Sequence, residues 1–353
     1  MSSVRRGPPW HRVLIIRPGA LGDVLLTLPA AQAVLAASPE THLEVMGDLR
    51  YLRSVCGRSA VRAVASFDAT EVAALFSPDM GDRVPIGAYL RSFDLVLSYV
   101  GPAESQFGRN LERLVAHAVH WDARAHASLD MHMSRFLQEP LAMLGIPTTD
   151  DPPCIMPSEG DIDTGARWWL EHGLRRRWVL AVHPGSGSSA KNWPVESFAE
   201  AVRRLCRDRD ATVLLVQGPA DAAPTVGLAR ALEGVRCVVL RELPLELLAT
   251  IIARCSLYLG NDSGVSHLAA ALGVPVVAVF GPTSPQVWAP RGPKVSVVSG
   301  DESCSPCSVA QRQSCAERRC LSNVSVAQVA AAANSIAVNG REDLSDPGKW
   351  SGT

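Results

Sequence analysis

The sequence predicts an α/β protein of two Rossmann-like domains, each built on a doubly wound parallel sheet. Short segments rich in β-branched residues alternate with helical patterns along the whole chain, an order typical of βαβ units. A length of 353 residues favours two domains, since one domain averages about 150 residues. The segments Val13–Gly19 (VLIIRPG) and Val179–Gly185 (VLAVHPG) also align without a gap, so each half begins with a strand and a Pro-Gly turn.

Short apolar runs bounded by Gly, Pro or polar residues are the predicted strands. In the first half they are Val13–Ile16, Leu43–Met46, Val61–Val64 and Leu95–Ser98. In the second half they are Val179–Val182, Thr212–Val216, Cys237–Leu240, Leu257–Leu259, Val276–Phe280 and Val295–Val298.

Helices between these strands carry start and stop signals. Pro194 and Pro244 each open a helix, the second over Leu245–Ala253, and a third helix over Val265–Leu272 ends at Gly273. Regular structure is interrupted at 150–157 (DDPPCIMP), a composition typical of a linker. We therefore expect an N-terminal domain over 1–155, a C-terminal domain over 156–335 and a polar tail over 336–353.

Composition and charge exclude several classes of protein. With 47% apolar and 20% charged residues the chain is an ordinary globular protein, and a net charge of −1 disfavours a nucleic-acid partner. The chain has no apolar run near the roughly 18 residues that span a bilayer, and we expect no signal peptide. Nine cysteines without an export signal fit a reducing compartment. We expect a cytoplasmic protein with at most peripheral contact to the inner membrane face, because basic clusters such as Arg175–Arg177 are short.

The segment 260–273 (GNDSGVSHLAAALG) follows a predicted strand and runs into a helix. Free backbone N–H groups of the first helical turn, the helix dipole and the hydroxyls of Ser263 and Ser266 could converge there on a phosphate beside the small Gly264. A helix that is simply capped by Asp262 or Ser263 is the alternative.

Two other loop segments carry charged residues at strand ends. The segment 183–194 (HPGSGSSAKNWP) places Lys191 where it could neutralise a leaving phosphate, an interaction worth about 3 kcal/mol in a site that excludes water; a solvated turn is the alternative. The segment 17–29 (RPGALGDVLLTLP) places Asp23 beyond the first strand, where ligands bind in parallel sheets. Asp23 is either a general base for a hydroxyl nucleophile or a cap of its own helix.

Taken together, these three segments resemble glycosyltransferase family 9, the family of the ADP-heptose:lipopolysaccharide heptosyltransferases. The resemblance rests on ALGDVLLTLPA, HPGSGSSAKNWP and GNDSGVSHLAAALGVPVVAVFGPTSP in this order, and it covers about residues 12–335. It implies the GT-B architecture, with two Rossmann-like domains facing a central cleft. It also implies an inverting reaction that needs no metal at the chemical step.

The resemblance assigns roles residue by residue. Asp23 matches the family's proposed catalytic base and Lys191 the lysine at the donor phosphates. Apart from the resemblance, we expect Gly22 and Arg109 on the acceptor side. The donor-binding positions are Ser186, Ser188, Ser189, Lys191, Asp221, Asp262, Ser263, Gly264, Val265 and His267.

The function implied is transfer of a heptose from ADP-heptose to a lipid-linked saccharide of the lipopolysaccharide core or a related envelope glycan. A different nucleotide sugar, an NAD-dependent oxidoreductase and a non-catalytic nucleotide-sugar-binding protein are the alternatives. The oxidoreductase is suggested by Gly185, Gly187 and Ala190, a relaxed dinucleotide fingerprint, but the next strand ends in Gln217 rather than an acidic residue.

Two further patterns are weaker. The four thiols of Cys304, Cys307, Cys315 and Cys320 fit a structural zinc or iron site, and equally well free reduced cysteines. Arg109, Arg113 and His117 recur every four residues on a predicted helix, whose face could contact an anionic acceptor or be merely solvated.

Overall fold

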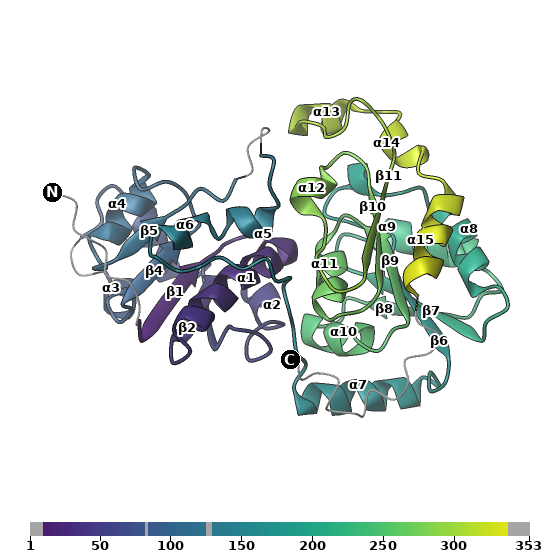
Figure 1. The fold of residues 1–353 in the computed structure, drawn as a ribbon, viewed down its shortest axis with the longest axis horizontal. Helices are drawn as coiled ribbons and strands as arrows, with labels where there is room; N and C mark the ends of the chain where they lie inside the picture. Colours follow the sequence, from purple (N-terminus) through teal and green to yellow (C-terminus); the bar gives the residue numbers. More distant parts are fainter. Residues whose placement is uncertain (1–9, 82–83, 125–128, 338–353) are drawn as a thin grey trace. The chain divides into compact units, whose positions relative to one another are not determined.

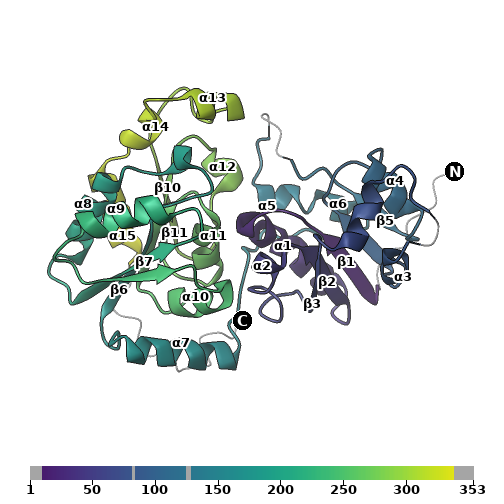
Figure 2. The ribbon, with the colours of Figure 1, turned by 180° about the vertical axis from the view of Figure 1, so that it is seen from behind.

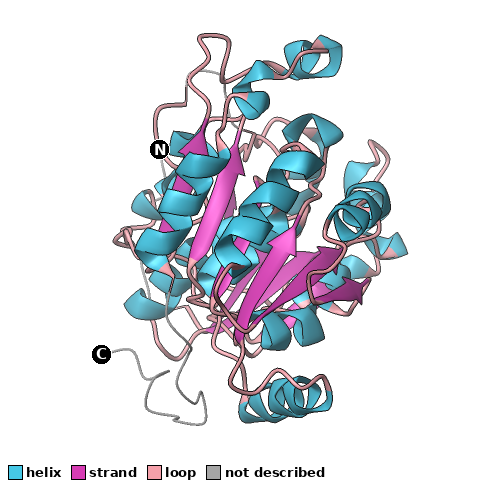
Figure 3. Cartoon of the chain, turned by 90° about the vertical axis from the view of Figure 1, so that its right-hand side faces the viewer, coloured by secondary structure: helices cyan, strands magenta, loops and turns pink. Residues whose placement is uncertain are grey.

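The computed structural model describes residues 10–81, 84–124 and 129–337. The chain divides into two compact units, unit 1 over Met1–Pro153 and unit 2 over Cys154–Thr353. Each unit carries one parallel β-sheet with helices against it, as Figures 1 and 3 show. The prediction of an α/β protein with two doubly wound parallel sheets is therefore confirmed. Most of the predicted polar tail, 338–353, lies outside the described residues.

Unit 1 has a five-stranded sheet in the order β3-β2-β1-β4-β5, with every pair parallel. Its side chains alternate between two buried faces. Leu14 and Ile16 pack with Phe107 and Leu111 of one helix layer, while Val13 and Ile15 are equally buried on the other face. The strands are β1 (Arg12–Ile16), β2 (His42–Gly47), β3 (Ala63–Ser66), β4 (Leu95–Ser98) and β5 (Ala118–His120).

The helices of unit 1 follow the strands in alternation, as βαβ connections require. They are α1 (Leu21–Ala37), α2 (Leu49–Leu52), the 3₁₀ helix η1 (Thr70–Phe76), α3 (Ile86–Leu90), α4 (Gln106–Glu112), α5 (Met133–Phe136) and α6 (Glu139–Ala142).

Unit 2 has a six-stranded parallel sheet in the order β11-β10-β9-β6-β7-β8. Helices cover both faces, with α10 and α11 on one side and α8 and α15 on the other (Figures 1 and 2). The strands are β6 (Trp178–His183), β7 (Ala211–Gln217), β8 (Cys237–Arg241), β9 (Leu257–Asn261), β10 (Val276–Phe280) and β11 (Val295–Ser299).

The amphipathic α8 illustrates why these helices form. Phe198, Val202 and Leu205 lie on one face and are buried in the core cluster with β6 and β7. The helices of unit 2 are α7 (Glu159–Glu171), the 3₁₀ turn η2 (Ser189–Lys191), α8 (Val195–Cys206), α9 (Ala222–Ala231), α10 (Leu245–Ile252), α11 (Gly264–Ala271), α12 (Pro285–Trp288), α13 (Val309–Ser314), α14 (Arg319–Ser322) and α15 (Val326–Ile336).

Both sheets have a topological switch point, where chain connections leave in opposite directions. In unit 1 it lies between β1 and β4, and in unit 2 between β6 and β9. Ligands of doubly wound folds bind outside the carboxyl ends of the strands at this point. The loops that follow β1, β6 and β9 contain the three segments singled out in the sequence.

Two local predictions were wrong, and one strand was missed. The helix predicted through Arg109, Arg113 and His117 ends at Glu112, because the chain turns to bring Ala118–His120 beside β4. That edge strand was missed, since three residues with one fully buried side chain give too short an apolar run. The strand predicted at Val61–Val64 begins two residues later, because the Val61 carbonyl accepts from Gly57 N–H in a turn. Within the described residues no helix has both the length and the apolarity to cross a membrane.

Candidate functional site

The candidate site of unit 2 is built where the neighbouring strands β6 and β9 end. His183 is the last residue of β6 and pairs with Gly260 of β9, which places Asn261 and Asp262 beside the loop that follows β6. Asn261 is fully buried; its amide group donates to the carbonyls of Pro184 (2.9 Å) and Gly185 (3.2 Å) and its carbonyl oxygen accepts from a backbone N–H at 2.9 Å. The β6 loop is therefore held in one conformation by the end of β9.

Lys191 and Asp262 form an ion pair at this edge of the sheet. The Lys191 ammonium lies 2.7 Å from Asp262 Oδ2, and the same oxygen accepts from the Thr283 hydroxyl at 2.7 Å. The Asp262 side chain is 8% exposed and that of Lys191 22% exposed. A buried carboxylate thus fixes the position of a lysine that still reaches solvent, which leaves its ammonium group available to an anionic ligand.

A second buried network joins three other residues. His183 Nε2 lies 2.9 Å from Asp221 Oδ2, and His183 Nδ1 lies 3.1 Å from the Ser263 hydroxyl. All three side chains are buried. Burial alone would raise the pKa of Asp221, but the hydrogen bond from His183, the positive charge of that ring whenever it is protonated, and the backbone N–H groups of Gly218 and Ser186 lower it below its usual value. Asp221 is therefore a carboxylate that holds the imidazole ring.

Position 185 requires a glycine, because the Asp221 carboxylate occupies the space that a larger side chain would need. A Cβ atom at Gly185 would lie 2.1 Å from Asp221 Oδ1. The three predicted serines follow in the same loop: Ser186 is buried, with its hydroxyl 2.6 Å from the Ser188 carbonyl, and Ser189 begins η2. The structure thus brings Asp221 and the serine loop together, but the Asp221 carboxylate is already hydrogen-bonded to His183.

The first turn of α11 contributes backbone donors. Ser263 is the N-cap residue, yet its hydroxyl makes no capping hydrogen bond, because it contacts His183 and Ser266 instead. Backbone N–H groups at the start of a helix have no intrahelical acceptor, so those of Gly264 and Val265 can serve an anion. His267 is buried in the same turn. The predicted donor-binding residues of this segment therefore lie at one helix N-terminus, beside Lys191.

The candidate site of unit 1 is centred on Asp23, in the first turn of α1. One carboxylate oxygen pairs with Arg17 at 2.8 Å, and the other accepts from Ala20 N–H at 2.9 Å. The Asp23 side chain is 32% exposed, whereas that of Arg17 is 8% exposed. Gly19 adopts φ 141°, and a Cβ there would lie 2.6 Å from Asp23 Oδ2. Asp23 thus caps its helix and also presents a carboxylate to solvent, so its predicted role as a general base stays a prediction.

The predicted acceptor-side residues differ in their placement. Gly22 adjoins Asp23 in the first turn of α1. Arg109 lies on α4, exposed, where its guanidinium donates to the Glu104 carbonyl and, at 2.8 Å, to the Gln106 side chain. The contacts of Arg109 in the described chain are thus local, and they do not connect it to Asp23.

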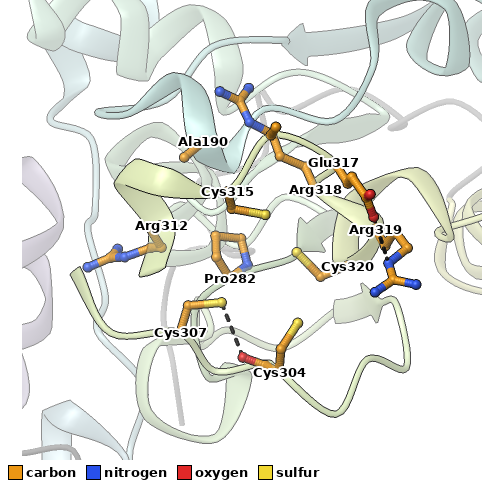
Figure 4. Close-up of a pocket in the computed structure, with 11 residues that line it drawn as sticks. Ala190, Pro282, Cys304, Cys307, Arg312, Cys315, Glu317, Arg318, Arg319 and Cys320 are labelled. Atoms are coloured by element: carbon orange, nitrogen blue, oxygen red, sulfur yellow. Dashed lines mark hydrogen bonds and ion pairs between the residues drawn. The ribbon is translucent and has the colours of Figure 1, made fainter. Parts of the chain in front are cut away.

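The four cysteines of the loop over 304–320 line one pocket of about 330 Å³ (Figure 4). Their sulfur atoms turn toward the same space around Pro282. Burial, reinforced by the neighbouring thiols, raises the pKa of Cys320 to about 11, and that of Cys307 is also raised. Among the described residues, however, His, Cys, Asp and Glu side chains form no group of three or more that could hold a metal ion. The structure therefore gathers these thiols without arranging them as a metal site.

This cysteine loop also braces the donor-side turn. Arg318 Nη1 donates to the Ser189 carbonyl at 2.9 Å, and Figure 4 shows its guanidinium directed away from the thiols. The Cys307 N–H donates to the Pro282 carbonyl at 2.9 Å, next to Thr283. The loop thus supports both the turn that carries Lys191 and the segment that holds Asp262.

Sequence reasoning missed several residues of these sites. Asn261 fixes the loop after β6, and buried hydrogen bonds or ion pairs to predicted residues come from Thr283, Arg17 and His183. Two of them, Arg17 and His183, directly follow a predicted strand, which was an available signal. Except for Asp23, which lies six residues after Arg17, the partners were not evident, because they lie on strands or loops distant in the sequence.

Comparisons with known proteins agree with this architecture. The profile of glycosyltransferase family 9 (heptosyltransferase) matches residues 157–316. Lipooligosaccharide heptosyltransferase 2 of Haemophilus influenzae is 27% identical over 317 residues, which is 81% of this chain and 88% of that protein.

Solved structures show the same fold. A glycosyl transferase family 9 protein of Veillonella parvula superposes with a TM-score of 0.77 at 19% identity, over 94% of this chain and 99% of that one. Escherichia coli heptosyltransferase WaaC with ADP-2-deoxy-2-fluoro heptose gives 0.61 at 21% identity, over 92% of this chain and all of that one. The fold is GT-B-like, and the protein is a glycosyltransferase. Over residues 157–316 it matches glycosyltransferase family 9, the heptosyltransferase family.

Proposed function

We propose that this enzyme transfers a heptose from ADP-heptose to a saccharide acceptor of the lipopolysaccharide core or a related lipid-linked envelope glycan. The observation that carries the proposal is the Lys191–Asp262 pair beside the N-terminus of α11, at the switch point of a Rossmann-like sheet. The heptosyltransferase of Haemophilus influenzae and the Escherichia coli structure with an ADP-heptose analogue support the choice of donor.

In this proposal unit 2 is the donor domain. The diphosphate of the donor accepts hydrogen bonds from the first-turn N–H groups of α11 and from Ser186, Ser188, Ser189 and Ser263. Lys191, held by Asp262 at 2.7 Å, neutralises the charge that grows on the departing diphosphate. Because these donors are preorganised in a partly buried site, they stabilise the transition state without rearrangement.

Unit 1 is the acceptor-side domain, with Asp23 as general base. Asp23 takes the proton of the acceptor hydroxyl, and the oxygen attacks the anomeric carbon as the bond from that carbon to the β-phosphate oxygen breaks. ADP leaves with the bonding electrons, so one displacement inverts the anomeric configuration. Arg17, at 2.8 Å, orients the carboxylate for this transfer. The chain's own cation and helix dipole stabilise the leaving group, so the mechanism uses no metal.

The test is incubation of the pure protein with a panel of nucleotide sugars and deacylated envelope glycans, followed by mass spectrometry of the products. A product heavier by one heptosyl group, formed from ADP-heptose alone, supports the proposal. Transfer from another nucleotide sugar would show that this sugar, and not ADP-heptose, is the donor. Thermal stabilisation by NAD(H), without stabilisation by any nucleotide sugar, would favour an oxidoreductase instead.

A further inference from the structure

The buried network around His183 continues beyond Asp221 and Ser263. The Ser263 hydroxyl lies 3.2 Å from that of Ser266, which donates to the Asn261 carbonyl at 2.5 Å. The Tyr258 hydroxyl lies 3.2 Å from the Ser266 oxygen. These side chains are all buried, so water does not supply a missing proton or lone pair, and each hydrogen must be accounted for within the network.

With a neutral imidazole, this accounting leaves Ser263 without a proton to give. An ionised carboxylate only accepts, so the hydrogen of the neutral ring lies on Nε2, toward Asp221 at 2.9 Å. His183 Nδ1 is then an acceptor and takes the hydrogen of the Ser263 hydroxyl. Ser263 therefore turns lone pairs toward the start of α11, where a diphosphate would need donors.

With a protonated imidazole, the direction of the hydrogen bond reverses. Nδ1–H donates to the Ser263 oxygen, and the Ser263 hydrogen is released to point at another acceptor. The charge of the imidazolium is balanced by Asp221, at hydrogen-bond distance. Releasing Ser263 without this proton would leave Nδ1 as a buried acceptor with no donor, which costs about 1–3 kcal/mol.

We propose that His183 is a positioning residue that takes up a proton when the donor binds, so that Ser263 can donate a hydrogen bond to the donor diphosphate. One N–H bond forms on Nδ1 with a proton from solvent, and no covalent bond to the ligand is made. Asp221 then acts as the counter-ion of His183 rather than as a direct ligand of the nucleotide. This inference rests on the proposed function, because it requires a diphosphate at the N-terminus of α11.

Other charged or titratable groups lie near the hydrogen-bonded set of Asp221, His183 and Ser263, which we call the relay. Asp262 and Lys191 neutralise one another in their ion pair. Burial raises the pKa of Tyr258 far above neutral, so its hydroxyl stays protonated. His267, in the first turn of α11, is the other histidine of the site and the other group able to take up a proton near neutral pH. The test must therefore separate His183 from His267.

The experiment is calorimetric titration of the full chain with ADP-heptose in buffers of different ionisation enthalpy, which counts protons taken up. A nucleotide sugar is chosen because its diphosphate, a diester, does not titrate near neutral pH. The titration is repeated at a series of pH values around neutral, so that the proton count is followed as a function of pH. We expect uptake that approaches one proton per bound donor, and donor affinity that falls as pH rises.

Two variants identify the groups responsible. His183→Asn keeps an amide where Nδ1 stood, which can donate to Ser263 without a proton from solvent. We expect it to abolish proton uptake and make affinity independent of pH, with affinity within about threefold of the wild type. Ser263→Ala removes the hydroxyl, and we expect no uptake and about tenfold weaker binding, the loss of one hydrogen bond to a charged group. Ser263→Thr, which retains a hydroxyl, restores both.

The matched control is His172→Asn, an exposed histidine of unit 2 stacked on Trp168. It should leave uptake and affinity unchanged.

Uptake that persists in His183→Asn would come from another group such as His267 and would overturn the proposal, as would wild-type binding without uptake. If ADP-heptose fails but ADP-glucose or UDP-glucose binds, the donor assignment falls and the relay is tested with that sugar. If no nucleotide sugar binds, the proposed function and the relay both fall. Should His183→Asn not fold, Ser263→Ala decides alone.

Discussion

The two units place the same local structure, a strand, a turn and a helix, at the switch point of a parallel sheet, yet they use the helix start differently. In unit 1 the side chain of Asp23 accepts from Ala20 N–H, so the carboxylate itself occupies the start of α1. In unit 2 the N-cap Ser263 makes no capping bond, so the start of α11 remains open to a ligand. One helix start therefore presents a negative group, and the other can receive one.

The two sites also differ in how deeply their carboxylates are buried. Asp23 is one-third exposed and has one charged partner, Arg17. Asp262 and Asp221 are buried, each in a network of several partners. A base must meet an incoming hydroxyl, whereas a phosphate site needs donors that are already fixed. The comparison suggests proton transfer at unit 1 and donor binding at unit 2. Each of these two roles can be tested by its own substitution.

The largest effect is expected for Asp23→Asn. The amide oxygen still accepts from Ala20 N–H, so α1 keeps its cap, but the side chain can no longer take a proton. Loss of a general base costs about 10²- to 10⁴-fold in rate. We expect kcat to fall by this factor and donor KM to change little, as measured by initial rates of transfer.

Asp48→Asn is the matched control for Asp23→Asn. Asp48 also caps a helix of unit 1, through Arg50 N–H, and also pairs with an arginine. It should retain nearly full kcat. If Asp23→Asn retained it as well, Asp23 would be a cap and nothing more.

The second effect tests the binding half of the comparison. Lys191→Ala removes the cation beside α11, and we expect kcat/KM to fall about 100-fold, corresponding to about 3 kcal/mol, with both kcat and KM affected. Asp262 then becomes an unpaired buried carboxylate, so the variant should also unfold at a lower temperature. The exposed Lys294 provides the control variant, Lys294→Ala. Unchanged donor KM and kcat in Lys191→Ala would remove this lysine from the site.

Much of the fold was predictable because its signals are local. The strand predicted at Val276–Phe280 has the bounds found in the structure, and β1, β6 and β9 differ by two residues at most. In a parallel sheet covered on both faces, nearly continuous apolar runs mark the strands, and the polar residues that follow them gather at one edge. For this reason, three segments far apart in the sequence could be singled out as site segments.

The partners within the site were not predictable, because they depend on strand order. His183 and Ser263 are separated by 80 residues and meet only because β6 and β9 are neighbours. Helical spacing was misleading beyond Glu112, because periodicity alone does not show where a helix stops. Likewise, the spacing of four cysteines suggested a metal site, but among the described residues the thiols share a pocket without forming a group that could hold a metal ion.

A smaller effect is expected where the cysteine loop braces the donor-side turn. Arg318→Ala removes the hydrogen bond to the Ser189 carbonyl, which lies two residues before Lys191. We expect donor KM to rise about fivefold, corresponding to about 1 kcal/mol, with kcat within about twofold. Arg319→Ala is the control, since Arg319 is exposed and pairs with Glu317 at the surface. Equal KM values for the two variants would show that the loop does not position the turn.

The smallest effect concerns stability and pH. The pKa of Asp221 is lowered in the folded chain, so its carboxylate stabilises the fold above the ordinary pKa of about 3.9, and this contribution is lost as the pH falls through the lower folded value. Asp221→Asn should therefore lower Tm by about 2–4 °C at neutral pH and by progressively less as the solution is acidified. Asp163→Asn changes an exposed carboxylate of α7 and should leave Tm unchanged both at neutral pH and in acid. A Tm difference for Asp221→Asn that stayed constant into acid would mean that the carboxylate charge plays no part, and the contrast between a buried, paired network in unit 2 and an exposed base in unit 1 would lose its electrostatic basis.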